Sequence, residues 1–113
     1  MDEGQVKAGG EAVVVLITMA TREEAEKIAC RLVEDRLAAC VNIVPRVRSL
    51  FSWEGKLSQS DEVLLVVKSR RARFRELVNA VKTLHSYSVP EIIALPILEG
   101  SAGYLQWIDD VTT

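Results

Sequence analysis

The sequence is poor in the residues from which disulfide frameworks and cofactor sites are built. Among 113 residues there are two cysteines, one histidine and 5% aromatic residues. Two cysteines do not make a disulfide framework in a chain of this size, so we interpret both as reduced thiols. The chain also contains no Walker phosphate loop, no GxGxxG, no GxSxG and no HExxH motif. These absences argue against the common enzyme classes, and we predict that the protein is not an enzyme.

Charge and hydropathy exclude further classes of protein. The net charge is −2, whereas a nucleic-acid-binding domain usually carries a basic excess. No stretch approaches the roughly 18 consecutive apolar residues that a membrane span requires. The segment Met1-Asp2-Glu3-Gly4 is acidic where a signal peptide is basic. We therefore expect a cytoplasmic protein with neither a nucleic-acid nor a membrane partner.

The chain does contain enough apolar residues for one core. Hydrophobic residues make up 49% of the sequence, which suffices for a domain of this length without covalent crosslinks. Residues 1–11 are polar and hold three of the six glycines. We predict a flexible N-terminal tail over residues 1–11 and a single domain over residues 12–113.

Hydrophobic periodicity predicts the first half of this domain. Ala12–Met19 is a continuous apolar run, which is typical of a strand buried on both faces. Thr21 and Glu24 have the spacing of a capping box ahead of a helix over residues 22–36. The strand predicted over residues 39–52 contains Pro45, which lacks an N–H and should lie at an edge or a bulge.

The second half continues the alternation of strands and helices. The predicted elements are a turn at residues 53–56, a return strand at 62–68, a helix at 71–84, a strand at 92–98 and a closing helix at 100–110. The order is β-α-β-β-α-β plus a C-terminal helix. We therefore predict an α+β domain with the ferredoxin-like split βαβ arrangement.

The predicted hairpin is too long for the helices that should cover it. A strand over residues 39–52 extends about 45 Å, whereas a helix of the same length covers about 21 Å. The overhanging tip carries the apolar residues Leu50, Phe51, Trp53 and Leu57, which are unfavourable in water. A long bare edge with such residues requires a partner. The overhang predicts oligomerisation without indicating the number of subunits.

A few side chains are candidates for metal binding. His85 is the only histidine and either ligates a metal or is a hydrogen-bonded residue at a helix end. Glu62 and Glu91 lie near strand ends and are suitable ligands for divalent cations, although no EF-hand-like spacing occurs. Cys30 and Cys40 have no CxxC spacing, so we interpret them as small, partly buried thiols.

A basic cluster and several aromatic residues are candidates for ligand binding. The basic cluster lies at the start of the second predicted helix and comprises Lys68, Arg70, Arg71, Arg73 and Arg75. Positive charge at the start of a helix opposes its dipole, so the cluster is either an anion site or a solvated face balanced by Glu76. Trp53, Tyr87, Tyr104 and Trp107 either stack on a ligand or anchor the core and an interface.

Five spaced blocks between Val13 and Trp107 resemble the CutA divalent-cation tolerance proteins. The blocks are Ala38-Ala39-Cys40-Val41-Asn42-Ile43, Phe51-Ser52-Trp53-Glu54-Gly55-Lys56, the pair Glu62 and Lys68, His85-Ser86-Tyr87-Ser88-Val89-Pro90-Glu91-Ile92, and Tyr104-Leu105-Gln106-Trp107. The resemblance implies a homotrimer in which the hairpin wraps onto a neighbour. It also implies a likeness to the trimeric PII signalling proteins, which bind small ligands between subunits.

The resemblance also implies a copper site, which this chain keeps only in part. Family members that bind copper are expected to have a cysteine at the end of the first strand and two histidines before the tyrosine. Those positions are Ile17 and Leu84-His85 in this chain, so only His85 remains. A tight, copper-selective site is therefore not expected.

Three hypotheses for function follow. The first is a metal-tolerance trimer with no required cofactor, which binds Cu²⁺ or another divalent cation weakly at His85, Glu62 and Glu91. The second is a PII-like regulatory trimer that binds a small anionic ligand through Lys68, the arginines and Tyr104. The third is a purely structural trimeric scaffold. In each of them the expected subunit interface includes Phe51, Trp53 and Trp107.

Overall fold

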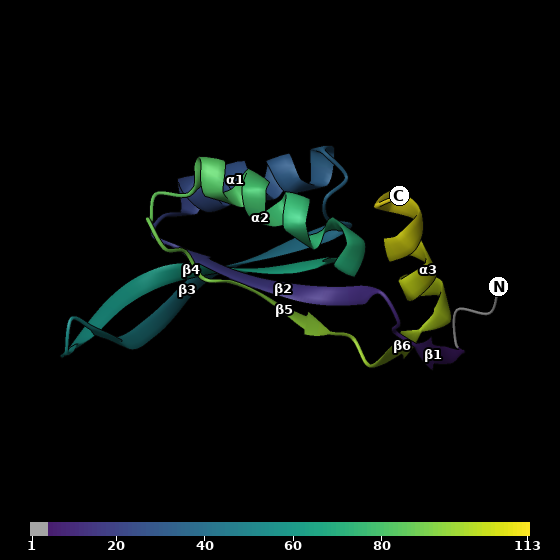
Figure 1. The fold of residues 1–113 in the computed structure, drawn as a ribbon, viewed down its shortest axis with the longest axis horizontal. Coiled ribbons are helices and arrows are strands. Elements are labelled where there is room, and N and C mark those ends of the chain that lie inside the picture. The colour runs from purple at the N-terminus through teal and green to yellow at the C-terminus, as the bar shows by residue number, and fades with distance from the viewer. Residues whose placement is uncertain (1–4) are drawn as a thin grey trace.

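A four-stranded antiparallel sheet carries two helices on one face (Figure 1). The structure is a computed structural model and describes residues 5–113. The strand order is β3-β4-β2-β5, and every neighbouring pair is antiparallel. The elements of this unit are β2 (Ala12–Met19), α1 (Arg22–Glu34), β3 (Cys40–Trp53), β4 (Lys56–Arg70), α2 (Phe74–Leu84) and β5 (Ile92–Pro96). The predicted split βαβ fold is confirmed. No helix among residues 5–113 is long and apolar enough to cross a membrane.

The N-terminal segment contains a strand that the sequence analysis did not predict. β1 (Val6–Ala8) pairs with β6 (Glu99–Ser101), which leads into α3 (Ala102–Val111). Gly9 donates to the carbonyl of Leu98, and a Cβ at Gly9 would lie 1.6 Å from the carbonyl oxygen of Ile97. The glycine therefore permits close packing of two backbones. The tail prediction is corrected at residues 6–8, while residues 1–4 lie outside the described part of the chain.

The core lies between the sheet and helices α1 and α2. Alternate residues of β2 and of the second half of β4 point toward the helices and are buried, whereas most residues between them are half-exposed on the opposite face. β2 is therefore covered mainly on one face, and the predicted burial on both faces is wrong for the single chain. The core side chains with no exposed surface include Val15, Ile17, Met19, Ile28, Leu32, Leu65, Val67, Leu77 and Val81.

The start of α1 has half of the predicted capping box. The Thr21 hydroxyl accepts a hydrogen bond from the Glu24 amide at 3.2 Å, as predicted. The Glu24 carboxylate is directed elsewhere: it accepts from the Ser86 amide at 3.1 Å and lies 3.4 Å from Nδ1 of His85. Glu24 therefore connects the first turn of α1 to the segment that follows α2.

The hairpin of β3 and β4 projects well beyond the helices (Figure 1). Glu54 and Gly55 both have positive φ, 50° and 77°, which is the geometry of a two-residue hairpin turn. The pairing register shifts between Val44 and Val47, so Pro45 lies in a bulge as predicted. β4 begins at Lys56 rather than at residue 62. Residues 57–61 are mainly polar, and strand pairing rather than burial holds them extended.

The buried face of β4 provides a test of the core. We expect Leu65→Ala to lower the free energy of unfolding by about 2–5 kcal/mol, because it opens a cavity beneath the helices. The matched control is Leu98→Ala, since the Leu98 side chain is 82% exposed. Chemical denaturation at one fixed protein concentration measures both values. Equal losses for the two variants would contradict the assignment of the core.

Candidate functional site

A groove of about 910 Å³ lies between the hairpin and the segment that joins α2 to β5. Its walls combine aromatic rings and serine hydroxyls with the carboxylates of Glu62 and Glu91. Outside the segment that joins α2 to β5, the lining residues belong to β2 and to the two strands of the hairpin, β3 and β4. The lining residues are Thr18, Arg48, Ser49, Leu50, Phe51, Trp53, Ser58, Ser60, Glu62, Tyr87, Ser88, Val89 and Glu91. The groove therefore brings together two of the three predicted metal ligands.

His85 holds the wall of this groove through both ring nitrogens. Its side chain has no exposed surface. Nε2 lies 2.7 Å from the carbonyl oxygen of Thr18, which can only accept, so Nε2 carries the proton. Nδ1 accepts from the Tyr87 amide at 3.0 Å. A metal ion could reach His85 only by displacing one of these partners.

Tyr87 links this anchor to a carboxylate of the groove. Its hydroxyl donates to Oε2 of Glu62 at 2.8 Å, and the Glu62 side chain is almost fully buried. Burial, followed by the hydrogen bond and charge of Glu62 and then the charge of Glu24, raises the pKa of Tyr87 to about 12. Glu91 remains exposed. Within residues 5–113, no three His, Cys, Asp or Glu side chains converge as a metal-ligand cluster.

The two predicted anion-binding residues, Lys68 and Tyr104, are both neighbours of Cys40. Lys68 on β4 is the register partner of Cys40 on β3, and its ammonium group donates to Oδ1 of Asn42. Burial raises the pKa of Tyr104, and the neighbouring Cys40 thiol raises it further. The Tyr104 ring lies 5.5 Å from that of Trp107. The two cysteines are not paired, as predicted, but Cys30 is exposed on α1, so its predicted partial burial is wrong.

Two arginines of the predicted basic cluster, Arg70 and Arg73, bind different partners. Arg70 donates to the hydroxyl and carbonyl oxygens of Thr112, at 2.9 and 2.8 Å, and so holds the end of α3. Arg73 lies in the short 3-10 turn Arg71–Arg73 before α2 and pairs with Glu76 in the first turn of α2 at 3.1 Å. The interpretation of the cluster as a face balanced by Glu76 is thus confirmed for Arg73.

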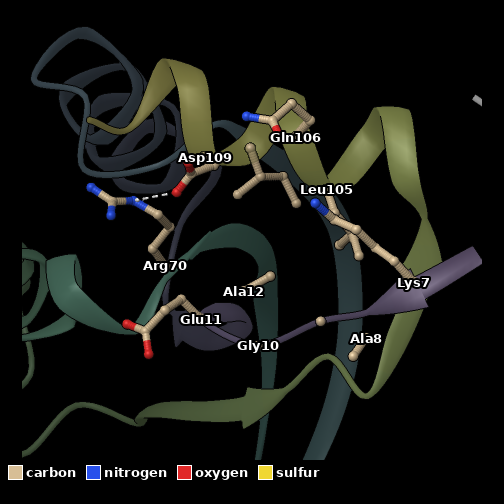
Figure 2. A pocket seen from close by; sticks show the side chains of 11 residues that line it. Lys7, Ala8, Gly10, Glu11, Ala12, Arg70, Leu105, Gln106 and Asp109 are labelled. Atoms are coloured by element: carbon tan, nitrogen blue, oxygen red, sulfur yellow. Dashed lines mark ion pairs between the residues drawn. The ribbon is translucent and has the colours of Figure 1, made fainter. Parts of the chain in front are cut away.

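A smaller hollow of about 240 Å³ lies beside Arg70, between the turn after β1 and α3 (Figure 2). Figure 2 also shows Arg70 directed toward Asp109, with 3.7 Å between Nε and Oδ1. The sequence analysis did not predict this contact, because Arg70 and Asp109 are far apart in sequence and only the packing of α3 brings them together.

The face of the sheet opposite the helices is apolar and uncovered. Register places its side chains in adjacent rows: Val14 lies beside Leu95, and Leu16 lies between Ile93 and Val66. Ile93 and Leu95 are 49% and 45% exposed. We call this surface the open face; its apolar residues are Val14, Leu16, Val44, Leu64, Val66, Ile93 and Leu95. It continues toward the hairpin tip, where Phe51 and Trp53 are also exposed.

The Tyr87–Glu62 hydrogen bond predicts a measurable pH dependence. A folded-state pKa near 12, against 10 in the unfolded chain, stabilises the fold below pH 10. That contribution is lost as the pH rises through about 12. We expect Glu62→Gln to lower the pKa of Tyr87 while burial keeps it above 10. Alkaline absorbance titration measures this change, with Tyr87→Phe to identify the signal and Glu91→Gln as the control. An unchanged titration in Glu62→Gln would refute the assignment.

Comparison with known proteins identifies the family. The family model described as CutA1 divalent ion tolerance protein matches residues 13–111. The divalent-cation tolerance protein CutA of Thermus thermophilus is 52% identical over 99 residues, which cover 88% of this chain and 96% of that protein. The chain covers only 56% of the chloroplastic CutA of Arabidopsis thaliana and 62% of human CutA.

Solved structures agree with this assignment. Cut A1 from Thermus thermophilus superposes with a TM-score of 0.89 at 50% identity, covering 90% of this chain and 99% of that one. CutA from Synechococcus elongatus superposes with a TM-score of 0.93 at 26% identity over all of both chains. Other relatives are named as chloroplastic or periplasmic, so a cytoplasmic location remains a prediction. The match over residues 13–111 and the agreement in fold show that this chain belongs to the CutA1 divalent ion tolerance family.

Proposed function

We propose that this chain acts in divalent-cation tolerance as a homotrimer that binds cations weakly in the groove beside its hairpin. The observation that carries the proposal is the open face. Seven apolar residues lie together there, and the chain supplies no described helix to cover them. Layered folds bury such a face against another layer, and a large exposed apolar patch marks an interaction surface. A second copy of the chain is the layer that we propose.

The sheet edges favour a closed ring of subunits. β3 and β5 are the two edges of the sheet, and they are different strands. Pairing between the β3 edge of one copy and the β5 edge of the next is therefore a head-to-tail contact, which closes into a ring when the rotation permits. The resemblance to CutA proteins supports a ring of three. The hairpin would then place Phe51 and Trp53 on a neighbour, with Trp107 at the same boundary.

The groove offers oxygen ligands to a cation. Carboxylates and hydroxyls suit hard divalent ions, whereas selective copper sites require thiolate or several imidazoles. Glu62 and Glu91 supply two carboxylates, and Ile17 stands where the resemblance would place a cysteine. His85 contributes by holding Tyr87 against Glu62. We therefore propose weak binding without copper selectivity.

A second candidate function is regulation by a small anion, as in PII-like proteins. The observation that favours it is the proximity of Lys68 and Tyr104 on either side of Cys40. The scaffold hypothesis shares the trimer but requires neither ligand. Ligand titrations of the intact protein distinguish these possibilities.

Assembly is tested at the hairpin tip. We expect sedimentation to give one species at three times the 12.5 kDa chain mass. Trp53→Ala should weaken assembly by about 2 kcal/mol or more, because truncating an aromatic anchor at an interface has a cost of that size. The control is Lys56→Ala at the same tip. A well-folded monomer at micromolar concentration, or unchanged assembly in Trp53→Ala, would contradict the proposal.

Cation binding is tested by calorimetry with Cu²⁺ and Zn²⁺. We expect dissociation constants on the order of 10⁻⁴ M, as in oxygen-ligand sites with few charges. Glu91→Gln should weaken binding about tenfold, which corresponds to roughly 1.4 kcal/mol. Glu99→Gln is the control, since Glu99 is exposed on β6. Unchanged binding in Glu91→Gln together with loss in His85→Ala would assign the ion to His85 instead.

A further inference from the structure

One charged side chain interrupts the open face. Lys68 lies in the same row as Val14 and Leu95, because Val14 pairs with both Lys68 and Leu95. Across β4, the same row ends at Cys40, and Asn42 is the next residue on that face of β3. The two other charged side chains on this face of β4 have partners: Glu62 accepts from Tyr87 at the groove end, and Arg70 donates to Thr112 at the α3 end. Lys68 thus introduces a single positive charge into a surface that assembly would remove from water.

Lys68 has a neutral partner only. Its ammonium group donates to the Asn42 amide oxygen, and none of the ion pairs found within residues 5–113 includes Lys68. A charge taken out of water requires a counter-charge and hydrogen bonds, otherwise burial is strongly unfavourable. An ammonium group has three donors, so at least two remain for another partner. Burial of the open face therefore requires a negative group at this point.

The neighbouring polar groups are donors as well. The Asn42 amide carries an NH₂ group beside the oxygen that Lys68 occupies. The hydroxyl of Tyr104 lies next to Cys40, the register partner of Lys68. Glu62 points from the same face of β4 but lies six residues away, about 20 Å along the strand. The local chemistry suits an acceptor-only group with several oxygens.

We propose that Lys68, Asn42 and Tyr104 bind a small oxyanion, a phosphate or carboxylate group, at the end of the open face near α3. The proposal rests on the proposed trimer, since assembly is what removes Lys68 from water. It assigns a ligand class to the second candidate function and a position distinct from the cation groove. Lys68 supplies the charge, and Asn42 orients the ammonium group.

The test uses thermal unfolding of the full chain in inorganic phosphate, in acetate and in chloride at matched ionic strength. We expect phosphate or acetate to raise the unfolding midpoint of the wild type, because a ligand that binds the folded state stabilises it. The salt that raises the unfolding midpoint identifies the oxyanion that binds. Lys68→Gln should weaken the apparent affinity roughly tenfold or more, as loss of a charged hydrogen bond does. Lys68→Arg should retain the response.

Lys82→Gln is the matched control, since Lys82 is exposed on α2. An absent response in the wild type, or an equal response in Lys68→Gln, would overturn the proposal. So would a Lys68→Gln variant that is destabilised equally in all three salts, because that result points to a carboxylate of a neighbouring subunit. Sedimentation of the same samples separates the two proposals. A trimer that ignores phosphate and acetate refutes only the anion site, whereas a monomer with a Lys68-dependent response refutes only the trimer.

Discussion

The apolar surface left uncovered on one side of the four-stranded sheet constrains the rest of the molecule. Helices α1 and α2 cover one face of the sheet, and the fully buried residues of β2 and β4 lie beneath them. The opposite face is as apolar in its centre, and α3 covers only its end, where Ala12 is buried against Leu105 and Ile108. An antiparallel sheet can leave a polar face in water, but this face is apolar, which is the basis of the proposed assembly. The long hairpin, the two different sheet edges and the exposed Trp53 all become intelligible as parts of such an assembly.

The groove depends on a small polar network at the base of the hairpin. Glu24 at the start of α1, His85 at the end of α2 and the carbonyl of Thr18 on β2 together hold the backbone before Tyr87. This links both helices and the central strand to the wall of the groove. His85 is therefore a positioning residue in the observed conformation. The Tyr87 hydroxyl and the carboxylates of Glu62 and Glu91 are the groups that this wall presents.

Much of the fold could be predicted from periodicity, since helices and strands separate their buried residues differently. The hairpin bulge at Pro45 followed from the missing N–H, and the Thr21 cap followed from its spacing to Glu24. β1 could not be predicted, because its pairing with β6 uses backbone groups and its three residues are too few, and too exposed, to give a periodic signal. The close approach at Gly9 is equally invisible without the position of Ile97.

The sequence predicted which residues line the candidate site, but not the contacts that they make. Glu62 and Glu91 share a groove, as a metal-site hypothesis requires, whereas both nitrogens of His85 already have backbone partners. The contact with Thr18 joins residues 67 positions apart and depends on the folded chain, whereas Tyr87 follows His85 by two residues. Lys68 and Tyr104 are far apart in sequence: the register of β3 against β4 places Lys68 beside Cys40, and the packing of α3 places Tyr104 beside the same thiol. Tertiary pairing of this kind leaves no local pattern.

Amide hydrogen exchange on the intact protein tests the central claim most directly. The amides of β5 that point away from β2 have no partner strand within the sheet of one chain. If the open face and its edges are buried against neighbouring copies, these amides exchange as slowly as those of β2 at micromolar concentration, and the protection weakens on dilution. Exchange of these amides at the rate of exposed loops, independent of protein concentration, would contradict the account.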